Sequence, residues 1–197
     1  MKEIMRLALI LLLLANVAVP SRADGETHFG RFRSAALGVE KAYVVQLPPD
    51  YGRSSRRYPV VYLLHGWGVT ETYWIKTLGL RETASRLGFD ATVVLPDGDR
   101  SYYADVAAQQ ELAQCVASWT GKEDADAGCV ARPAYESYIV SDLVGHVDRM
   151  YLTIADRRAR ALVGESAGGY GAVMLAMRNK HVFSAGAAPS SFLSPLD

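Results

Sequence analysis

The chain has 197 residues, half of them hydrophobic, which is enough for one buried core and one domain. It carries 21 basic and 21 acidic residues, so its formal net charge is zero. A protein that binds nucleic acid or an anionic membrane surface usually shows an excess or a block of positive charge. We therefore expect no nucleic-acid partner.

The N-terminal segment, residues 1–23, has the pattern of a secretory signal peptide. Lys2 and Arg6 give it a positive start, an apolar run covers residues 7–19, and small residues flank Arg22. The run of about 13 residues is shorter than the roughly 20 that a membrane-spanning helix needs. We expect a cleaved signal and a secreted or periplasmic protein with no stable membrane anchor. The alternative is an N-terminal anchor.

The two cysteines, Cys115 and Cys129, both lie in the part expected to be exported. In an oxidising compartment such a pair most simply forms one disulfide, which would stabilise the fold by roughly 3 kcal/mol. The alternative is two unpaired thiols. No histidine clusters with these cysteines, so we expect no metal site and no cofactor.

Apolar stretches with two different periods alternate along the rest of the chain, after a polar lead-in at residues 24–40. The expected strands cover residues 41–47, 58–64, 91–95, 159–163 and 182–188, and the expected helices cover residues 71–87, 136–151 and 167–178. Residues 99–134 lack either period and are expected to form a surface excursion. This alternation predicts one α/β domain over residues 24–197, with a mostly parallel sheet covered by helices on both faces.

The strand expected at 159–163 runs directly into Gly164-Glu165-Ser166-Ala167-Gly168, and a helix is expected to follow. This order of elements is typical of a nucleophile elbow, in which flanking glycines allow a strained turn that exposes the serine hydroxyl. The alternative is a tight strand-to-helix turn with an incidental serine. We therefore identify Ser166 as the candidate nucleophile.

Attack by a serine hydroxyl on a carbonyl group places negative charge on oxygen, so the site needs hydrogen-bond donors for that oxygen. The N–H of Ala167 is one candidate because it follows the nucleophile at a helix N-terminus. The loop His65-Gly66-Trp67-Gly68 follows an earlier strand and could supply the second donor. We expect that donor to be the N–H of Trp67.

Several of these motifs together resemble the esterase D family, which includes S-formylglutathione hydrolases, feruloyl and acetyl xylan esterases, and mycolyltransferases. The similar segments are residues 62–66, 138–143, 147–151 and 164–172. The resemblance spans roughly residues 40–190. It implies an α/β-hydrolase fold and acyl transfer through a serine acyl-enzyme, with small-molecule or polysaccharide-linked esters as substrates.

The family resemblance also implies a catalytic triad in the order serine, acid, histidine. After Ser166 the chain contains one histidine, His181, and one aspartate, Asp197. A helix over residues 167–178 would be about 18 Å long, which places His181 at the opposite end of the sheet. We therefore expect a partial copy of the fold that lacks the last strands, the acid and the base.

The other three histidines are not expected to act as the base either. His65 is expected to have a structural role in the oxyanion loop, His146 to face solvent, and His28 to lie near the mature N-terminus. Six aromatic residues could line a substrate cleft: Trp67, Tyr73, Trp74, Tyr102, Tyr103 and Trp119. The functional hypotheses are an exported serine esterase, an acyltransferase that uses the same acyl-enzyme, and a catalytically inactive esterase-like module.

Overall fold

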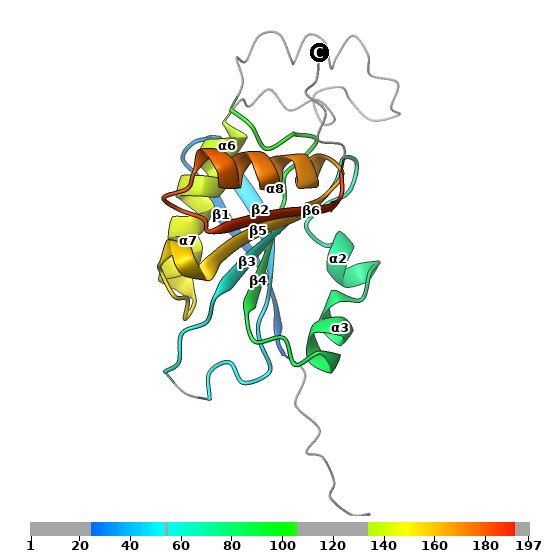
Figure 1. The fold of residues 1–197 in the computed structure, drawn as a ribbon, viewed down its shortest axis with the longest axis vertical. Coiled ribbons are helices and arrows are strands. Elements are labelled where there is room, and N and C mark those ends of the chain that lie inside the picture. The colour runs from blue at the N-terminus through cyan, green and yellow to red at the C-terminus, as the bar shows by residue number, and fades with distance from the viewer. Residues whose placement is uncertain (1–24, 54, 106–133, 192–197) are drawn as a thin grey trace, which may run out of the picture.

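A computed structural model describes residues 25–53, 55–105 and 134–191, and six strands in these ranges form one mixed sheet (Figure 1). The strands are β1 (Thr27–Ser34), β2 (Val39–Gln46), β3 (Val60–Leu64), β4 (Thr92–Pro96), β5 (Arg160–Glu165) and β6 (Ala185–Ser190). Their order across the sheet is β1-β2-β4-β3-β5-β6. The expected signal peptide, both cysteines and most of the expected surface excursion lie outside the described residues.

The central and C-terminal strands run parallel, because β3 pairs in parallel with β4 and β5, and β5 pairs in parallel with β6. This arrangement confirms the mostly parallel sheet predicted from the sequence. The lead-in interpretation of residues 24–40 was wrong, since β1 and the first part of β2 occupy them as an antiparallel pair. β2 is in turn antiparallel to β4, so this hairpin continues the parallel sheet on one side.

One helix was expected over residues 71–87, and two short helices take its place, α2 (Tyr73–Lys76) and α3 (Leu80–Arg86). Gly79 separates them with a φ of 61°, a left-handed conformation that glycine adopts without steric penalty. Leu78 and Leu87, which one continuous helix over residues 71–87 would include, are 47% and 70% exposed. The break at Gly79 therefore changes which side chains meet the sheet.

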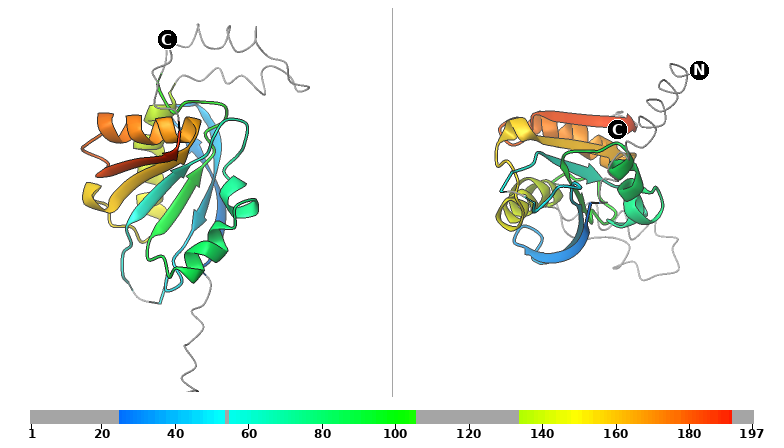
Figure 2. Two further views of the ribbon diagram at one scale, coloured as in Figure 1. Left: turned by 45° about the vertical axis from the view of Figure 1, so that its right-hand side comes forward. Right: turned by 90° about the horizontal axis from the view of Figure 1, so that it is seen from below.

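The other helical segments match their predicted positions. Residues 135–150 form a continuous helical stretch made of α6 (Tyr135–Ser137), a π-helical segment η1 (Tyr138–Leu143) and α7 (Val144–Met150). A short 3-10 turn, η2 (Arg157–Ala159), precedes β5. Helix α8 (Ala167–Arg178) follows β5 and contacts both β5 and β6 (Figure 2).

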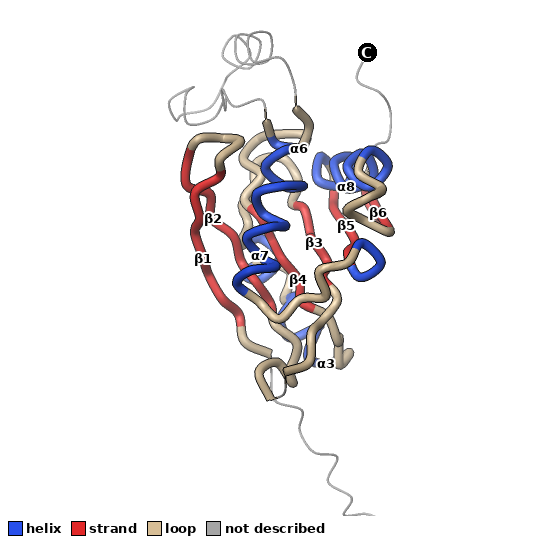
Figure 3. The backbone as a smooth tube through the Cα atoms, turned by 90° about the vertical axis from the view of Figure 1, so that its left-hand side faces the viewer, coloured by secondary structure: helices blue, strands red, loops and turns tan. Residues whose placement is uncertain are grey.

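Side chains alternate between the two faces of the sheet, and each face has its own core. Tyr62 and Leu162 belong to the larger core, which α8 and the helical stretch 135–150 cover. Leu63 and Val93 belong to the smaller core, against which Trp74 of α2 packs. Helices therefore cover both faces of the sheet, and Figure 3 shows α7 lying across the first of them.

No helix within residues 25–53, 55–105 and 134–191 combines the length and the apolar character that a membrane-crossing segment requires.

Candidate active site

Parallel strands bring their carboxyl ends to one edge of a sheet, and the loops that follow three strands meet there. His65 follows β3, Asp97 follows β4, and Ser166 follows β5. In open α/β sheets this edge is where ligands bind. The order of the strands therefore places the serine turn and the expected oxyanion loop side by side, since β3 pairs directly with β5.

Ser166 has the backbone of a strained turn, with φ 53° and ψ −123°. A non-glycine residue in such a conformation costs about 1–3 kcal/mol and persists only where its surroundings hold it. The N–H of Ser166 donates to the Ser190 carbonyl at 2.6 Å, and its own carbonyl accepts from Ser191 Oγ at 2.7 Å and from the Tyr170 N–H at 3.1 Å. Three contacts on two sides therefore fix the turn.

Serine at the start of a helix usually caps it by accepting a hydrogen bond from a backbone N–H of the first turn. Ser166 occupies this position at the start of α8, and its side chain makes no such bond. The residue is exposed, and its hydroxyl has no partner within the described part of the chain. The turn therefore presents a free hydroxyl to solvent rather than using it for helix capping.

Two glycines of the motif are required by close approach. A Cβ on Gly164 would lie 2.1 Å from the Gly168 carbonyl oxygen, and a Cβ on Gly168 would lie 2.4 Å from the Leu64 oxygen and 2.5 Å from the His65 oxygen. These neighbours are backbone atoms that cannot rotate away. The first turn of α8 consequently packs directly on the backbone where β3 ends.

The oxyanion loop touches the serine through Gly66, where an added Cβ would lie 3.2 Å from Ser166 Cβ and 3.8 Å from Ser166 Oγ. The next N–H along the loop belongs to Trp67, and no hydrogen bond within the described residues uses it. Ala167 is the first residue of α8, so its N–H has no intrahelical acceptor. Ala167 thus follows Ser166 in the chain and Trp67 follows the glycine that approaches it, and the role of both N–H groups stays a prediction.

An aromatic surface lies beside this turn. Trp67 is 47% exposed and its ring centroid lies 5.5 Å from that of Tyr102, which is 38% exposed. Tyr102 in turn meets Tyr170 of α8 edge-to-face at 6.0 Å. Of the other aromatic cleft candidates, Tyr103 is buried, so it cannot line a cleft.

Three of the four histidines lie outside the loops that meet at Ser166. His28 lies on β1 and pairs with Glu26 at 3.1 Å, and His181 is exposed beyond the end of α8. His146 was expected to face solvent, and this was wrong. Its ring stacks on Phe32 and its Nε2 lies 2.8 Å from Tyr43 Oη, because β1 covers this side of α7. Burial, assisted by Arg149, lowers the pKa of His146.

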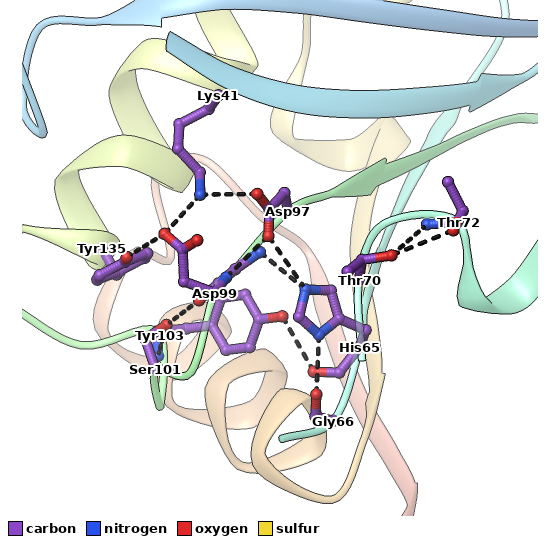
Figure 4. Close-up of polar contacts among 11 residues, drawn as sticks. Lys41, His65, Gly66, Thr70, Thr72, Asp97, Asp99, Ser101, Tyr103 and Tyr135 are labelled. Atoms are coloured by element: carbon purple, nitrogen blue, oxygen red, sulfur yellow. Dashed lines mark hydrogen bonds and ion pairs between the residues drawn. The ribbon is translucent and has the colours of Figure 1, made fainter. Parts of the chain in front are cut away.

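His65 is 1% exposed and uses both ring nitrogens in hydrogen bonds to the backbone. Nδ1 lies 2.8 Å from the Gly66 carbonyl oxygen, and Nε2 accepts from the Gly98 N–H at 2.8 Å (Figure 4). Neither nitrogen is left to accept a proton from Ser166. Taken with the other three positions, this means that no histidine of the chain is placed as the general base.

A charge cluster built on the buried Lys41 lies next to His65 and was not predicted from the sequence. Lys41 Nζ of β2 lies 2.9 Å from Asp97 Oδ2 and 2.5 Å from Asp99 Oδ2, and the Tyr135 hydroxyl also donates to Asp99 (Figure 4). Burial alone would raise the pKa of Asp97, but the Lys41 ammonium and the Asp99 N–H outweigh it and hold that pKa well below its usual value. The sequence did contain a signal for this cluster. Asp97 and Asp99 flank Gly98 directly after a strand, and Lys41 interrupts a mainly apolar strand.

The described residues contain no group of three or more histidine, cysteine or acidic side chains that could hold a metal ion. Cys115 and Cys129 lie outside these residues, so their pairing stays a prediction. This edge of the sheet presents an exposed serine hydroxyl on a strained turn, with two candidate hydrogen-bond donors in the flanking backbone.

Comparison with known proteins agrees with this geometry. Residues 34–197 match the protein-family model named Esterase. The esterase Rv1288 of Mycobacterium tuberculosis is 29% identical over 157 residues, which cover 79% of this chain and 30% of that protein. An endo-1,4-beta-xylanase/feruloyl esterase of Xylanibacter ruminicola is 28% identical over 156 residues, covering 77% of this chain and 20% of that protein. The chain thus spans less than a third of the length of these curated relatives.

Solved structures show the same fold. A ferulic acid esterase superposes with a TM-score of 0.66 at 24% identity, covering 88% of this chain and 61% of that one. An S-formylglutathione hydrolase from Agrobacterium tumefaciens superposes with a TM-score of 0.63 at 21% identity, covering 82% and 57%. The fold is therefore that of an α/β hydrolase, as predicted, and the chain belongs to the esterase family.

Proposed function

We propose that Ser166 is the nucleophile of a carboxylic ester hydrolase and forms an acyl-enzyme with its substrate. The observation that carries this proposal is the strained φ of 53° at Ser166, combined with a hydroxyl that caps no helix and is exposed. The fold holds this conformation at a cost of about 1–3 kcal/mol, which a merely connecting turn has no reason to do.

The second element of the proposal is the oxyanion hole. In the acylation step the ester carbonyl carbon bonds to Ser166 Oγ, and the carbonyl oxygen gains negative charge. The N–H groups of Trp67 and Ala167 stabilise that charge, and the positive end of the α8 dipole adds to it. Loss of the alcohol then leaves the acyl group on the serine.

The third element is the base, which none of the four histidines supplies. Enzymes of this type keep a residual rate when the base is removed, because the oxyanion hole and substrate binding still act. We therefore expect the 197-residue chain to acylate slowly and to deacylate slowly, since both steps need proton transfer. Imidazole in solution should accelerate both.

A fluorophosphonate probe followed by peptide mass spectrometry tests the nucleophile. Ser166 should carry the label, and Ser166→Ala should abolish it. Ser141→Ala, at an exposed serine of the helical stretch, is the matched control and should label as wild type does. Labelling that persists in Ser166→Ala would show that another residue is the nucleophile.

The substrate class follows from the surface beside the serine. Trp67, Tyr102 and Tyr170 form consecutive ring contacts there, and aromatic side chains bind planar acyl groups and sugar rings through their faces. Relatives named feruloyl or ferulic acid esterase support an ester of an aromatic acid with a polysaccharide. The same acyl-enzyme would serve an acyltransferase, and product analysis with and without an added alcohol or sugar separates the two reactions.

A catalytically inactive module is the second candidate, and the engagement of both His65 nitrogens is the observation that favours it. The fluorophosphonate experiment discriminates between the two, because an inactive ester-binding module should bind ester without reacting at Ser166.

We also propose that the protein is exported and that Cys115 pairs with Cys129. The expected signal peptide over residues 1–23 supports export, and the oxidising compartment supports the disulfide. N-terminal sequencing of the mature protein and mass measurement with and without reductant test both claims. A retained N-terminus, or two alkylatable thiols without reductant, would contradict them.

A further inference from the structure

The proton on the His65 ring can be assigned from its two hydrogen-bond partners, since Asp97 Oδ1 lies 3.8 Å from Nε2, beyond hydrogen-bond reach. The Gly98 N–H lies 2.8 Å from Nε2 and can only donate, so Nε2 must accept. The proton of the neutral ring therefore sits on Nδ1, which donates to the Gly66 carbonyl at 2.8 Å. If the proton were on Nε2, the Nε2–H would point at the Gly98 N–H, and the bare Nδ1 would point at the Gly66 carbonyl oxygen. Both contacts would be repulsive.

The bond to the Gly66 carbonyl fixes the peptide group that follows it. The Gly66–Trp67 peptide is trans, so its C=O and N–H point in opposite directions. Since the carbonyl of Gly66 points to the His65 ring, the N–H of Trp67 points away from that ring. Gly66 itself is in contact with Ser166, and the Trp67 N–H has no other partner within the described ranges.

The position of the Gly98 N–H is in turn set by the charge cluster. Asp97 and Asp99 flank Gly98, and both carboxylates bind the Lys41 ammonium, whose side chain is 4% exposed. The Asp99 N–H donates to Asp97 Oδ1 at 3.0 Å, and the Asp97 N–H donates to the Ala42 carbonyl at 3.1 Å. The loop after β4 is therefore tied to β2 on either side of the N–H that meets His65.

Tyr103, which packs against α8, holds the loop after β3 through a hydrogen bond to its backbone. The Tyr103 hydroxyl donates to the His65 carbonyl at 3.0 Å, and the Tyr103 ring lies against Gly171, where an added Cβ would be 2.7 Å from Tyr103 Cβ. Tyr103 adopts a φ of 59°, which is uncommon for a bulky residue. His65 is thus held at its ring and at its backbone.

We propose that Lys41, Asp97 and Asp99 are positioning residues for the oxyanion hole. They fix the Gly98 N–H, which holds His65 as the Nδ1–H tautomer. His65 then orients the Gly66–Trp67 peptide so that its N–H faces the reacting oxygen. This inference rests on the proposed function of the Trp67 N–H, and it explains why a buried lysine pairs with two half-buried aspartates beside a loop that contacts the nucleophile.

Two substitutions of His65 separate its two bonds. The side-chain nitrogen of His65→Asn is as many bonds from the backbone as Nδ1, so it can still donate to Gly66. The oxygen of His65→Gln corresponds to Nε2, so it keeps the Gly98 contact and loses the donor. Since removal of one oxyanion donor lowers rates by about 10²–10³, His65→Gln should react with a fluorophosphonate at least about 10-fold more slowly than His65→Asn. Equal rates for the two variants would overturn the proposal.

The tautomer is measured independently of any reaction, from ¹⁵N spectra of histidine-labelled protein near neutral pH, with His65 assigned by its loss in His65→Asn. We expect protonated Nδ1 and unprotonated Nε2 in the wild type, and a mixture in Lys41→Met. Lys180→Met, at an exposed lysine, is the control and should leave the spectrum unchanged. A wild-type ring protonated on Nε2, or a Lys41→Met spectrum like that of the wild type, would overturn the inference.

If Lys41→Met does not fold, Tyr135→Phe carries the same test, because it removes the hydroxyl that donates to Asp99 and leaves the charges in place. A wild type whose Ser166 does not react with the probe would refute the proposed function, and the tautomer measurement would still decide whether the charge cluster controls His65.

Discussion

Replacing Gly168 by alanine tests how the serine turn is built. In an ordinary helix this change is stabilising, since glycine is about 1 kcal/mol less favourable than alanine. At Gly168 the added Cβ would lie 2.4 Å from the Leu64 oxygen and 2.5 Å from the His65 oxygen. We therefore expect the sign to reverse.

The size of the effect follows from these distances. Ordinary contact begins near 3.4 Å, so the start of α8 must move away from the end of β3 by about 1 Å. Overpacking costs about 1–3 kcal/mol, and the upper end applies because the clash is with two backbone carbonyls. After the gain of about 1 kcal/mol in helix propensity, the free energy of unfolding should fall by about 2 kcal/mol. A displacement of about 1 Å between nucleophile and donors should also slow the reaction of Ser166 by about 100-fold.

Gly145→Ala is the matched control, because it makes the same change within helix α7. Its added Cβ meets only the flexible end of Arg149, at 3.3 Å, so it should stabilise the protein by about 0.5–1 kcal/mol. Thermal denaturation and fluorophosphonate labelling measure both variants. In a chain of this size, Gly168→Ala should lower the melting temperature by about 4–8 °C. A Gly168→Ala protein as stable and as reactive as the wild type would refute the close packing.

Three further predictions concern the cluster, the aromatic surface and the base. The native pKa of Asp97 lies below its ordinary value, so its carboxylate contributes stability above the unfolded pKa of about 3.9, and this contribution is lost as the pH falls toward the native pKa. In Asp97→Asn the free energy of unfolding should therefore fall less steeply as the pH is lowered. An unchanged pH dependence would contradict the ion pairing of Asp97 with Lys41. Tyr102→Ala should lower kcat/KM for a feruloyl ester by about 2- to 10-fold relative to an acetyl ester, and equal losses would argue against ring stacking. Imidazole should accelerate turnover of a p-nitrophenyl ester in proportion to its concentration but not in Ser166→Ala, and a saturating or absent effect would point to a base within the chain.

The strands that build the site were predictable, because each is a short apolar run with a turn signal after it. β4 is fully buried, β3 nearly so, and β5 alternates between buried and half-buried residues, and such apolar strands differ sharply from their flanks in the sequence. Strand β1 was missed because it is amphipathic and charged, with Phe29 62% exposed and Arg31 facing Glu40 at 3.8 Å. It is held by pairing with β2 and by the stacking of Phe32 on the distant His146, neither of which shows in the strand's own residue pattern.

The candidate site was predictable where it lies in one contiguous motif, and not where it depends on contacts between distant residues. Ser166 and its glycines lie in one contiguous motif whose strand and helix the sequence also shows. Lys41 and Asp99 are 58 positions apart, and the bonds of His65 depend on the exact path of two loops. The environment of His146 depends on β1, so missing that strand also produced the wrong expectation of solvent exposure. Backbone geometry of this kind is set by tertiary packing rather than by local residue preference.

Trapping of an acyl-enzyme tests the central claim most directly. The chain is mixed with p-nitrophenyl acetate, quenched in acid and digested, and the peptide that contains Ser166 is examined by mass spectrometry. With no histidine placed to assist deacylation, the account predicts one acetyl group per chain, retained on Ser166 and absent in Ser166→Ala. Acetyl groups on other residues only, or an unmodified Ser166 despite release of p-nitrophenol, would contradict it.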